Sequence, residues 1–310
     1  MLFKNLLVYR FTQPFTLDPE SLHQHLDAKP FRPCGSQELS TLGWVAPVGD
    51  GDAPLVHAAN GCLMVCLQRQ SRLLPAAVVN DALAERVAEI EAREARRPGK
   101  KERTDLKDEI TFELLPRAFT RTGRLYAYID PRAGLLVVNS GAHNRAEDLL
   151  SQLRESLGSL PVLPLKTRDP IPTTLTQWLR DGAAPAGFTL GGECELRDSA
   201  DDSAVIRCKN QDLGSEEIRN HLDAGMYVSK LALEWCGDIA FLVDDKLAVK
   251  RLKFGDLIND KLGEVNAESA AEQFDVDFTI MTGEFAVFIP ALLDALGGEE
   301  GVTGGEPGGG

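Results

Sequence analysis

A proline-rich stretch near the middle of the sequence divides the chain into two segments. At residues 156–175 it reads SLGSLPVLPLKTRDPIPTTL, and its four prolines impose extended backbone geometry directly after Gly158, a residue type that often ends a helix. This composition predicts a stiff connector. A chain of 310 residues with such a break is expected to form two domains, or one elongated domain of several parts.

Strand and helix patterns occur on both sides of the connector. They follow no regular βαβ order, so an α+β fold is favoured over a doubly wound parallel sheet. A succession of strand, turn, strand and helix at 125–144 recurs at 239–256, which two related halves would explain, although one such match also arises by chance. The predicted strands cover residues 3–9, 62–68, 125–129, 135–139, 204–208, 228–233, 239–243 and 247–252. The predicted helices cover residues 19–27, 76–97, 102–115, 144–157, 215–223 and 278–296.

The expected organisation follows from these patterns. Residues 1–75 and 116–170 form a first α+β half, residues 76–115 a projecting basic helical hairpin, residues 171–298 a second α+β half, and residues 299–310 a disordered Gly-rich tail. The first residues are predicted to form a strand rather than a signal peptide, and no segment is expected to have the length and apolarity of a transmembrane helix. We therefore expect a cytoplasmic protein with no membrane partner.

Charge is distributed unevenly along the chain. The net charge of −14 would by itself argue against a nucleic-acid partner, because phosphate contacts need Lys and Arg. Eleven basic and eight acidic residues lie between Arg86 and Arg124, whereas twelve acidic residues and the single Lys261 lie between Gly255 and the C-terminus. The positive charge is therefore concentrated in one stretch of an otherwise acidic chain.

The basic stretch begins with two predicted helices. The apolar residues of the first helix recur at helical spacing and form one stripe, and the string PGKKER separates this helix from a second one that begins near Glu102. These patterns predict a hairpin with a basic tip. On the residues alone, a solvated helix with pairs such as Glu89 and Arg93 is favoured over nucleic-acid binding, and contact with a partner protein is the third alternative. The candidate DNA-binding residues at the tip are Arg93, Arg96, Arg97, Lys100 and Lys101.

A phenylalanine follows the second predicted helix. In LLPRAF, at residues 114–119, Pro116 ends the helix and places Phe119 in a loop between Arg117 and Arg121. Phe119 is either a core residue, which the residues alone favour, or an anchor in an interface. Arg117 and Arg121 are further candidates for DNA binding.

The second half carries another set of cations. Arg207, Lys209 and Gln211 alternate at the end of a predicted strand and are expected to share one face. Long side chains with several donors suit phosphate oxygens, although a solvent-facing strand is the favoured interpretation of the residues alone. The candidates near the next strand end are Lys250, Arg251 and Lys253.

Catalytic patterns are absent from the sequence. GxSxG, P-loop, GxGxxG and HExxH motifs do not occur. The five histidines have no acid or thiol at a spacing typical of a catalytic or metal site, and the six cysteines form no CxxC pair. We therefore predict a protein with reduced thiols and without enzymatic activity, metal or cofactor.

Several longer strings resemble one family, the bacterial recombination-associated RdgC proteins. They occur in the family's order from near the start of the chain to about residue 298. The matching strings are FKNLLVYR (3–10), FRPCGSQELSTLGWVAP (31–47), ANGCLMVCLQ (59–68), LKDEITFELLPRAF (106–119), LGSLPVLPL (157–165), KNQDLGSEEIRNHLDAG (209–225), KLALEW (230–235), KRLKF (250–254) and FDVDFTIMTGE (274–284).

The resemblance implies a nucleoid-associated protein that is not an enzyme and that binds single- and double-stranded DNA with little sequence preference. It implies a horseshoe-shaped subunit that closes into a ring-shaped homodimer through two interfaces, around a positively lined hole wide enough for a duplex. It further implies that the protein limits recombinase filament activity in recombination and replication restart. The alternative is a protein-interaction scaffold that acts directly on the recombinase.

Three positions can be carried over from the family. Phe119 in LLPRAF matches an aromatic residue at a subunit contact. Lys209 and Gln211 in KNQDL match a basic and amide cluster linked to DNA binding, and Asn210 stands where some relatives carry a second lysine. The positive charge of this cluster is therefore one unit lower than in those relatives.

Overall fold

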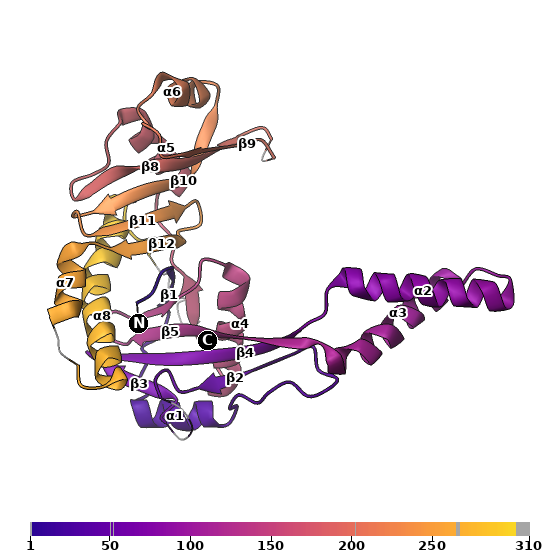
Figure 1. Cartoon of the computed structure of the whole chain (residues 1–310). Coiled ribbons are helices and arrows are strands. Elements are labelled where there is room, and N and C mark those ends of the chain that lie inside the picture. The colour runs from indigo at the N-terminus through magenta and orange to yellow at the C-terminus, as the bar shows by residue number, and fades with distance from the viewer. Residues whose placement is uncertain (1, 50, 52, 202, 265–266, 302–310) are drawn as a thin grey trace, which may run out of the picture.

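The computed structural model describes residues 2–49, 51, 53–201, 203–264 and 267–301 (Figure 1). Within these ranges the chain forms two antiparallel sheets and eight α-helices, and a pair of the helices projects away from both sheets. The α+β class is thus confirmed, and the subunit is elongated.

The first sheet has seven strands. Their order is β2-β4-β5-β6-β1-β7, and β3 pairs with β4. Helices α1 (Pro19–Asp27) and α4 (His143–Leu157) bury Leu22 and Leu149 in one core with Val65 and Ile129 of the sheet. The strands are β1 (Leu7–Phe11), β2 (Ser40–Val45), β3 (Val56–Ala59), β4 (Cys62–Leu73), β5 (Phe119–Asp130), β6 (Leu135–Val138) and β7 (Val162–Pro164).

The second sheet has five strands in the order β12-β11-β10-β8-β9. Helices α5 (Ile171–Asp181) and α6 (Glu216–Asp223) pack against β10, and α7 (Asp256–Glu264) packs against α8 (Ala270–Ala295). The strands are β8 (Phe188–Asp198), β9 (Val205–Lys209), β10 (Met226–Trp235), β11 (Ile239–Asp244) and β12 (Val249–Phe254).

One continuous hydrophobic core joins the two sheets. On α8, Phe278 contacts the Tyr128 ring of β5 at 6.0 Å between centroids, and Phe288 contacts the Phe241 ring of β11 at 5.0 Å. The backbones of Leu6 and Val249 exchange two hydrogen bonds, of 2.8 and 3.0 Å, so the segment before β1 lies along the edge strand β12. The two sheets therefore share one core, and α8 contributes to it from both sides.

Helix α8 differs from two expectations. It begins at Ala270, eight residues before the predicted start. An 18-residue window within its 26 residues reaches a mean hydropathy of 1.6, so by length and composition it could cross a membrane, and the expectation that no segment could is wrong. Phe278, Phe285 and Phe288 are fully buried between α8 and the sheets, which is the arrangement of a core helix.

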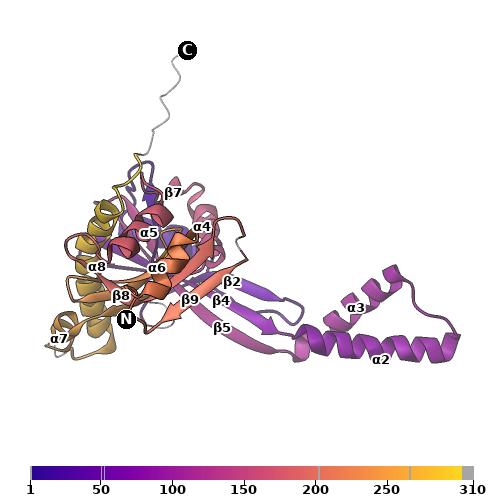
Figure 2. The same ribbon diagram turned by 90° about the horizontal axis from the view of Figure 1, so that it is seen from above.

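Strands β4 and β5 continue beyond β6 as a long ribbon, and β2 pairs with β4 along it as far as Ser71. Helices α2 (Ala76–Glu94) and α3 (Lys100–Leu114), with the 3₁₀ turn η1 (Leu115–Arg117), connect the ends of this ribbon (Figure 2). We call residues 69–124 the arm. Its own core is small and consists of Val79, Leu83 and Ile110 with partly buried neighbours. The arm thus places the predicted helical hairpin far from the rest of the subunit.

The connector and the tail also contain structure that the sequence patterns missed. Residues 162–164 form β7 beside β1, and Pro172 lies in the first turn of α5, where the missing N–H of proline costs nothing. At the expected start of the tail, Glu299 accepts hydrogen bonds from Arg10, and the backbone N–H of Glu300 donates to Lys166. Residues 302–310 lie outside the described residues.

Candidate nucleic-acid interface

Five cations from three strands of the second sheet line one groove of about 340 Å³. We call it the cationic groove. Two of these cations come from β9, one from β10 and two from β12. The cations are Arg207, Lys209, Lys230, Lys250 and Arg251. Three of the candidates predicted from the sequence, at positions 209, 250 and 251, therefore meet in one place.

A buried carboxylate holds two of these cations in position. Glu195 of β8 is only 4% exposed, and its Oε2 accepts hydrogen bonds of 2.8 Å from both Arg207 Nε and Lys230 Nζ. Its Oε1 accepts a further hydrogen bond of 3.0 Å from Ser229 Oγ. Burial by itself would raise the pKa of Glu195, but the hydrogen bonds from Lys230, Arg207 and Ser229 outweigh it and lower the pKa to about 2.

A β-bulge brings Lys250 and Arg251 to the same side. Consecutive strand residues normally point to opposite faces, but the register between β11 and β12 shifts at this point and Arg251 adopts a left-handed φ of 53°. Lys250 Nζ pairs at 2.7 Å with the buried Asp244, and Arg251 pairs at 2.8 Å with Glu193. The bulge therefore adds two anchored cations to the groove.

Two predicted residues lie outside the groove. Arg207 and Lys209 share a face as expected, but β9 ends at Lys209 and Asn210 takes a left-handed φ of 51°, so Gln211 leaves the alternation. The backbone N–H of Gln211 donates to Gly192 at 3.2 Å. Lys253 is exposed on β12 and does not line the groove.

Sequence reasoning missed Lys230 and the anchoring carboxylates. Lys230 lies in the string KLALEW, and only the pairing of β10 with β8 places it beside Glu195. An acid that alternates with buried residues, as Glu195 does between Cys194 and Leu196, is the available signal for such an anchor.

The tip of the hairpin carries seven basic and three acidic residues between Arg93 and Lys107. The arginines take part in surface ion pairs: Arg93 with Glu94 at 2.8 Å, Arg96 with Glu102 at 2.7 Å, and Arg97 with Glu91 at 3.4 Å. Glu89 pairs with Arg86 rather than with the expected Arg93. Hydrogen bonds from Arg96 hold the pKa of the Glu102 carboxyl below its usual value.

Beyond these pairs, the start of α3 presents exposed cations. Lys100, Lys101, Arg103 and Lys107 are all exposed, and three of them line a groove of about 650 Å³ between the splayed ends of α2 and α3 (Figure 2). Leu83 and the buried Pro98 also line this groove. The tip therefore combines solvated positive charge with a small apolar surface.

Phe119 is the first residue of β5 and not part of a loop. It pairs with Leu73 of β4, and its side chain is 84% exposed. The interpretation of Phe119 as a core residue is therefore wrong for the subunit, because a core residue would be buried. Arg117 in η1 and Arg121 on β5 are exposed on either side of it.

Cysteine and histidine chemistry does not converge in the described part of the chain. Cys194 and Cys208 lie opposite each other on β8 and β9 as buried thiols, and burial raises the pKa of Cys194 to about 12. Among the described residues, no group of three or more His, Cys, Asp or Glu side chains is placed to hold a metal ion.

Comparison with known proteins decides the family. The family model described as "Putative exonuclease, RdgC" matches residues 1–299. The chain belongs to the RdgC family. Proteins named "Recombination-associated protein RdgC" from two Pseudomonas strains are similar to it over 301 residues, P. putida GB-1 with 49% and P. aeruginosa LESB58 with 52% identity. In both comparisons the match covers 97% of this chain and 98% of the relative. A relative from Aeromonas hydrophila is 46% identical over 300 residues, which cover 97% of this chain and 99% of the relative.

Proposed function

We propose that this chain binds single- and double-stranded DNA without sequence preference, as a ring-shaped homodimer, and that it thereby limits recombinase filaments in recombination and replication restart. The observation that carries the proposal is the cationic groove, in which the β-bulge and the buried Glu195 fix the positions of the cations. Membership of the RdgC family and the recombination-associated names of its relatives support it.

The groove suits phosphates rather than bases. Its Lys and Arg side chains offer donors on a sheet face, and none of the described residues that line it belongs to a helix that could enter a major groove. Backbone contacts of this kind position DNA but carry no sequence information. The acidic remainder of the chain repels phosphate, so DNA is directed to the few basic surfaces.

The arm supports the proposed ring-shaped homodimer. Its length and its distance from the second sheet leave an open space on one side of the subunit, which a second copy would close (Figure 1). The exposed Phe119 and Leu73 at the base of the helices are the proposed subunit contact. Arg117, Arg121 and the hairpin cations would then face DNA near that contact. We place such a protein in the cytoplasm, on the nucleoid.

A salt titration tests DNA binding. We expect the affinity for a labelled duplex to fall steeply as salt rises, by about 0.9 in log Kd per log salt for each phosphate contact. Reversing the charge at Arg97, Lys100 and Lys101 should weaken binding to every sequence alike. Affinity that does not depend on salt, or loss for one sequence only, would contradict the proposal.

The groove between α2 and α3 favours a second candidate function. Its cationic walls and its apolar floor at Leu83 and Pro98 fit an acidic peptide, so the hairpin could dock on the recombinase directly. This scaffold hypothesis predicts that recombinase inhibition survives substitutions that abolish DNA binding.

The family description names an exonuclease, and this activity can be tested directly. Labelled DNA is incubated with the protein and Mg²⁺ or Mn²⁺, and we expect the DNA to remain intact.

A further inference from the structure

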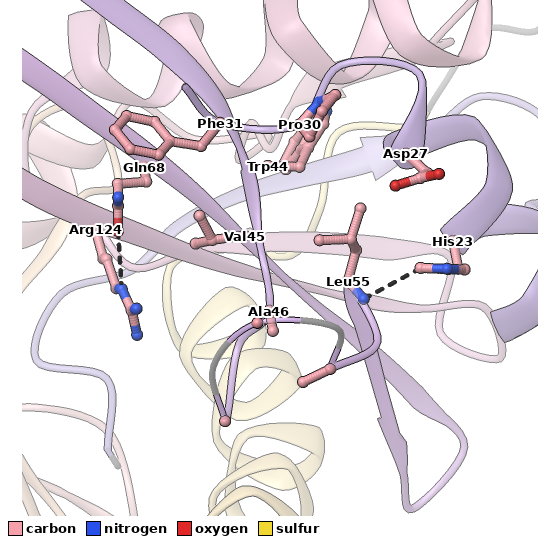
Figure 3. Close-up of a pocket in the computed structure, with 13 residues that line it drawn as sticks. His23, Asp27, Pro30, Phe31, Trp44, Val45, Ala46, Leu55, Gln68 and Arg124 are labelled. Atoms are coloured by element: carbon pink, nitrogen blue, oxygen red, sulfur yellow. Dashed lines mark hydrogen bonds between the residues drawn. The ribbon is translucent and has the colours of Figure 1, made fainter. Parts of the chain in front are cut away.

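A second cavity, of about 450 Å³, lies at the edge of the first sheet and has no part in the function proposed above. Helix α1, the segment after it, β2, β4 and β5 all contribute to its lining (Figure 3). Its volume lies within the range of small-ligand sites. Val45, Ala46 and Leu55 form its apolar part, and polar side chains lie at both ends.

The aromatic side of this cavity is held rigidly. The segment 29–31 runs beside β2, because the N–H of Phe31 donates to Trp44 O at 2.9 Å and the N–H of Trp44 donates to Lys29 O at 3.0 Å. This close approach requires Gly43, where any Cβ would collide with the Phe31 backbone. The half-buried Phe31 ring is therefore presented to the cavity on a fixed backbone.

The polar groups at the two ends have defined hydrogen-bonding roles. At one end Gln68 Oε1 accepts from Arg124 Nε at 3.1 Å, which leaves the Gln68 amide nitrogen as a donor beside an exposed guanidinium. At the other end His23 Nδ1 accepts from the Leu55 N–H at 3.2 Å, so in the neutral ring Nε2 carries the proton and is a donor. Asp27 is an exposed acceptor beside it.

We propose that this cavity binds one unpaired nucleobase of single-stranded DNA, with the base stacked on Phe31. Three features fit this ligand. An aromatic ring offers a stacking surface, which every base can use. The donors and the acceptor suit the polar edges of a base, and Arg124 supplies the positive charge that the adjoining phosphate needs.

The proposal gives the protein a preference that the cationic groove cannot supply. Bases in a duplex are already stacked and paired, so they reach such a cavity only after extrusion. Bases of single strands and gaps reach it without that cost. The inference rests on the proposed DNA binding and adds a site that selects unpaired nucleotides.

Substitution at Phe31 tests the site. The binding of one labelled single-stranded oligonucleotide and of the duplex of the same sequence is measured for the wild type, Phe31→Ala and Phe31→Trp. We expect Phe31→Ala to bind the single strand about fivefold or more weakly, the lower end of a lost stacking contact. Duplex affinity should stay unchanged, and Phe31→Trp should restore single-strand binding. Phe112→Ala removes a phenylalanine that lies on α3, away from this cavity, and is the control.

A photocrosslink gives a readout that does not depend on affinity. A single strand that contains 5-iodouracil is irradiated with the full-length protein, and the crosslinked peptide is identified by mass spectrometry. We expect a crosslink at Phe31. Crosslinks at other positions only, or equal losses on single strand and duplex in Phe31→Ala, would overturn the proposal. If the wild type binds neither DNA, the proposed function itself is overturned. If the wild type binds the duplex and Phe31→Ala binds both DNAs as the wild type does, only this site is overturned.

Discussion

The cationic groove and the hairpin tip present positive charge in two different ways. In the groove, Lys230 and Lys250 are largely buried beside carboxylates that are about 5% exposed, and the sheet fixes their positions. At the tip, the arginines pair with exposed acids on helix surfaces, and the apolar core beneath them is small. The groove therefore holds its cations at fixed spacing, whereas the tip offers them on mobile side chains.

The difference teaches where structure and binding are coupled. Buried ion pairs cost desolvation, and removing one partner leaves an uncompensated charge. Exposed pairs contribute little and can be changed without unfolding. Substitutions in the groove should therefore alter stability as well as DNA binding, while those at the tip should alter DNA binding alone.

The largest effect on stability is expected for Glu195→Ala. It leaves the partly buried Lys230 without its acceptor, whereas the exposed Arg207 is resolvated, so the free energy of unfolding should fall by about 3 kcal/mol, the lower end for breaking a buried pair. Chemical denaturation measures this change. Glu102→Gln, which removes an exposed pair at the tip, is the control and should leave the midpoint unchanged. Equal effects of the two variants would break the comparison.

Acid should weaken the second sheet next. Because the folded pKa of Glu195 is about 2 and the ordinary value is 4.5, its contribution is complete above pH 4.5 and is lost as the pH falls towards 2. The difference corresponds to about 3 kcal/mol. Unfolding curves recorded between pH 6 and pH 2 measure it, and Glu195→Gln should lack this part of the pH dependence. A wild type and variant with parallel pH profiles would refute the assignment.

Substitution of one lysine on each surface compares the contributions of the groove and the tip to DNA binding. Lys209→Ala in the groove and Lys101→Ala at the tip should each reduce the salt slope by about 1, the loss of one phosphate contact. The loss of affinity should be larger for Lys209, because four further cations line the same groove and add to the positive potential around a bound phosphate. A larger loss for Lys101 would place the principal DNA contact on the arm.

Phe119→Ala tests whether the base of the arm is an interface. The side chain is 84% exposed, so the unfolding free energy of the subunit should change by less than about 0.5 kcal/mol. If Phe119 anchors a dimer, the dissociation constant should rise about tenfold, as measured by sedimentation. Phe112→Ala serves as the control. Loss of subunit stability with an unchanged dimer would contradict the interface role of Phe119.

The smallest effect is expected at the end of α2. Ala95 adopts a left-handed φ of 52°, which glycine tolerates better. Ala95→Gly should therefore stabilise the hairpin by up to about 1 kcal/mol, detected as slower hydrogen exchange in α2 and α3. Exchange in the second sheet should not change. A shift there would show that the two regions are more closely coupled than their packing indicates.

The sequence predicted many elements because their patterns are local. The helices at 19–27 and 144–157 have clear amphipathic spacing, and both appear in the structure within one residue of the predicted ends. Strands β2, β3, β7 and β8 and helix α5 were missed. Strand β8 contains glycines and acids, which are uncommon within strands. The prolines at the start of α5 indicated a connector, although proline is tolerated in the first turn of a helix.

The candidate site was predicted in part. Lys209, Lys250 and Arg251 were named as candidates, and the structure brings them together, but their neighbour Lys230 and the carboxylate of Glu195 were not recognised. Sequence spacing places residues on a face of their own strand only. Which strands lie side by side depends on long-range pairing, and the bulge at Arg251 changes the face locally.

The sequence by itself determined the α+β class and the separation of basic from acidic segments, since local periodicity and composition carry that information. It also indicated the family, through the long matching strings that occur in the family's order. Only the tertiary structure decided that Phe119 is exposed, that α8 is a core helix shared by both sheets, and that cations from β9, β10 and β12 meet around buried carboxylates. These outcomes depend on contacts between residues far apart in the chain, whose free energy no local pattern records.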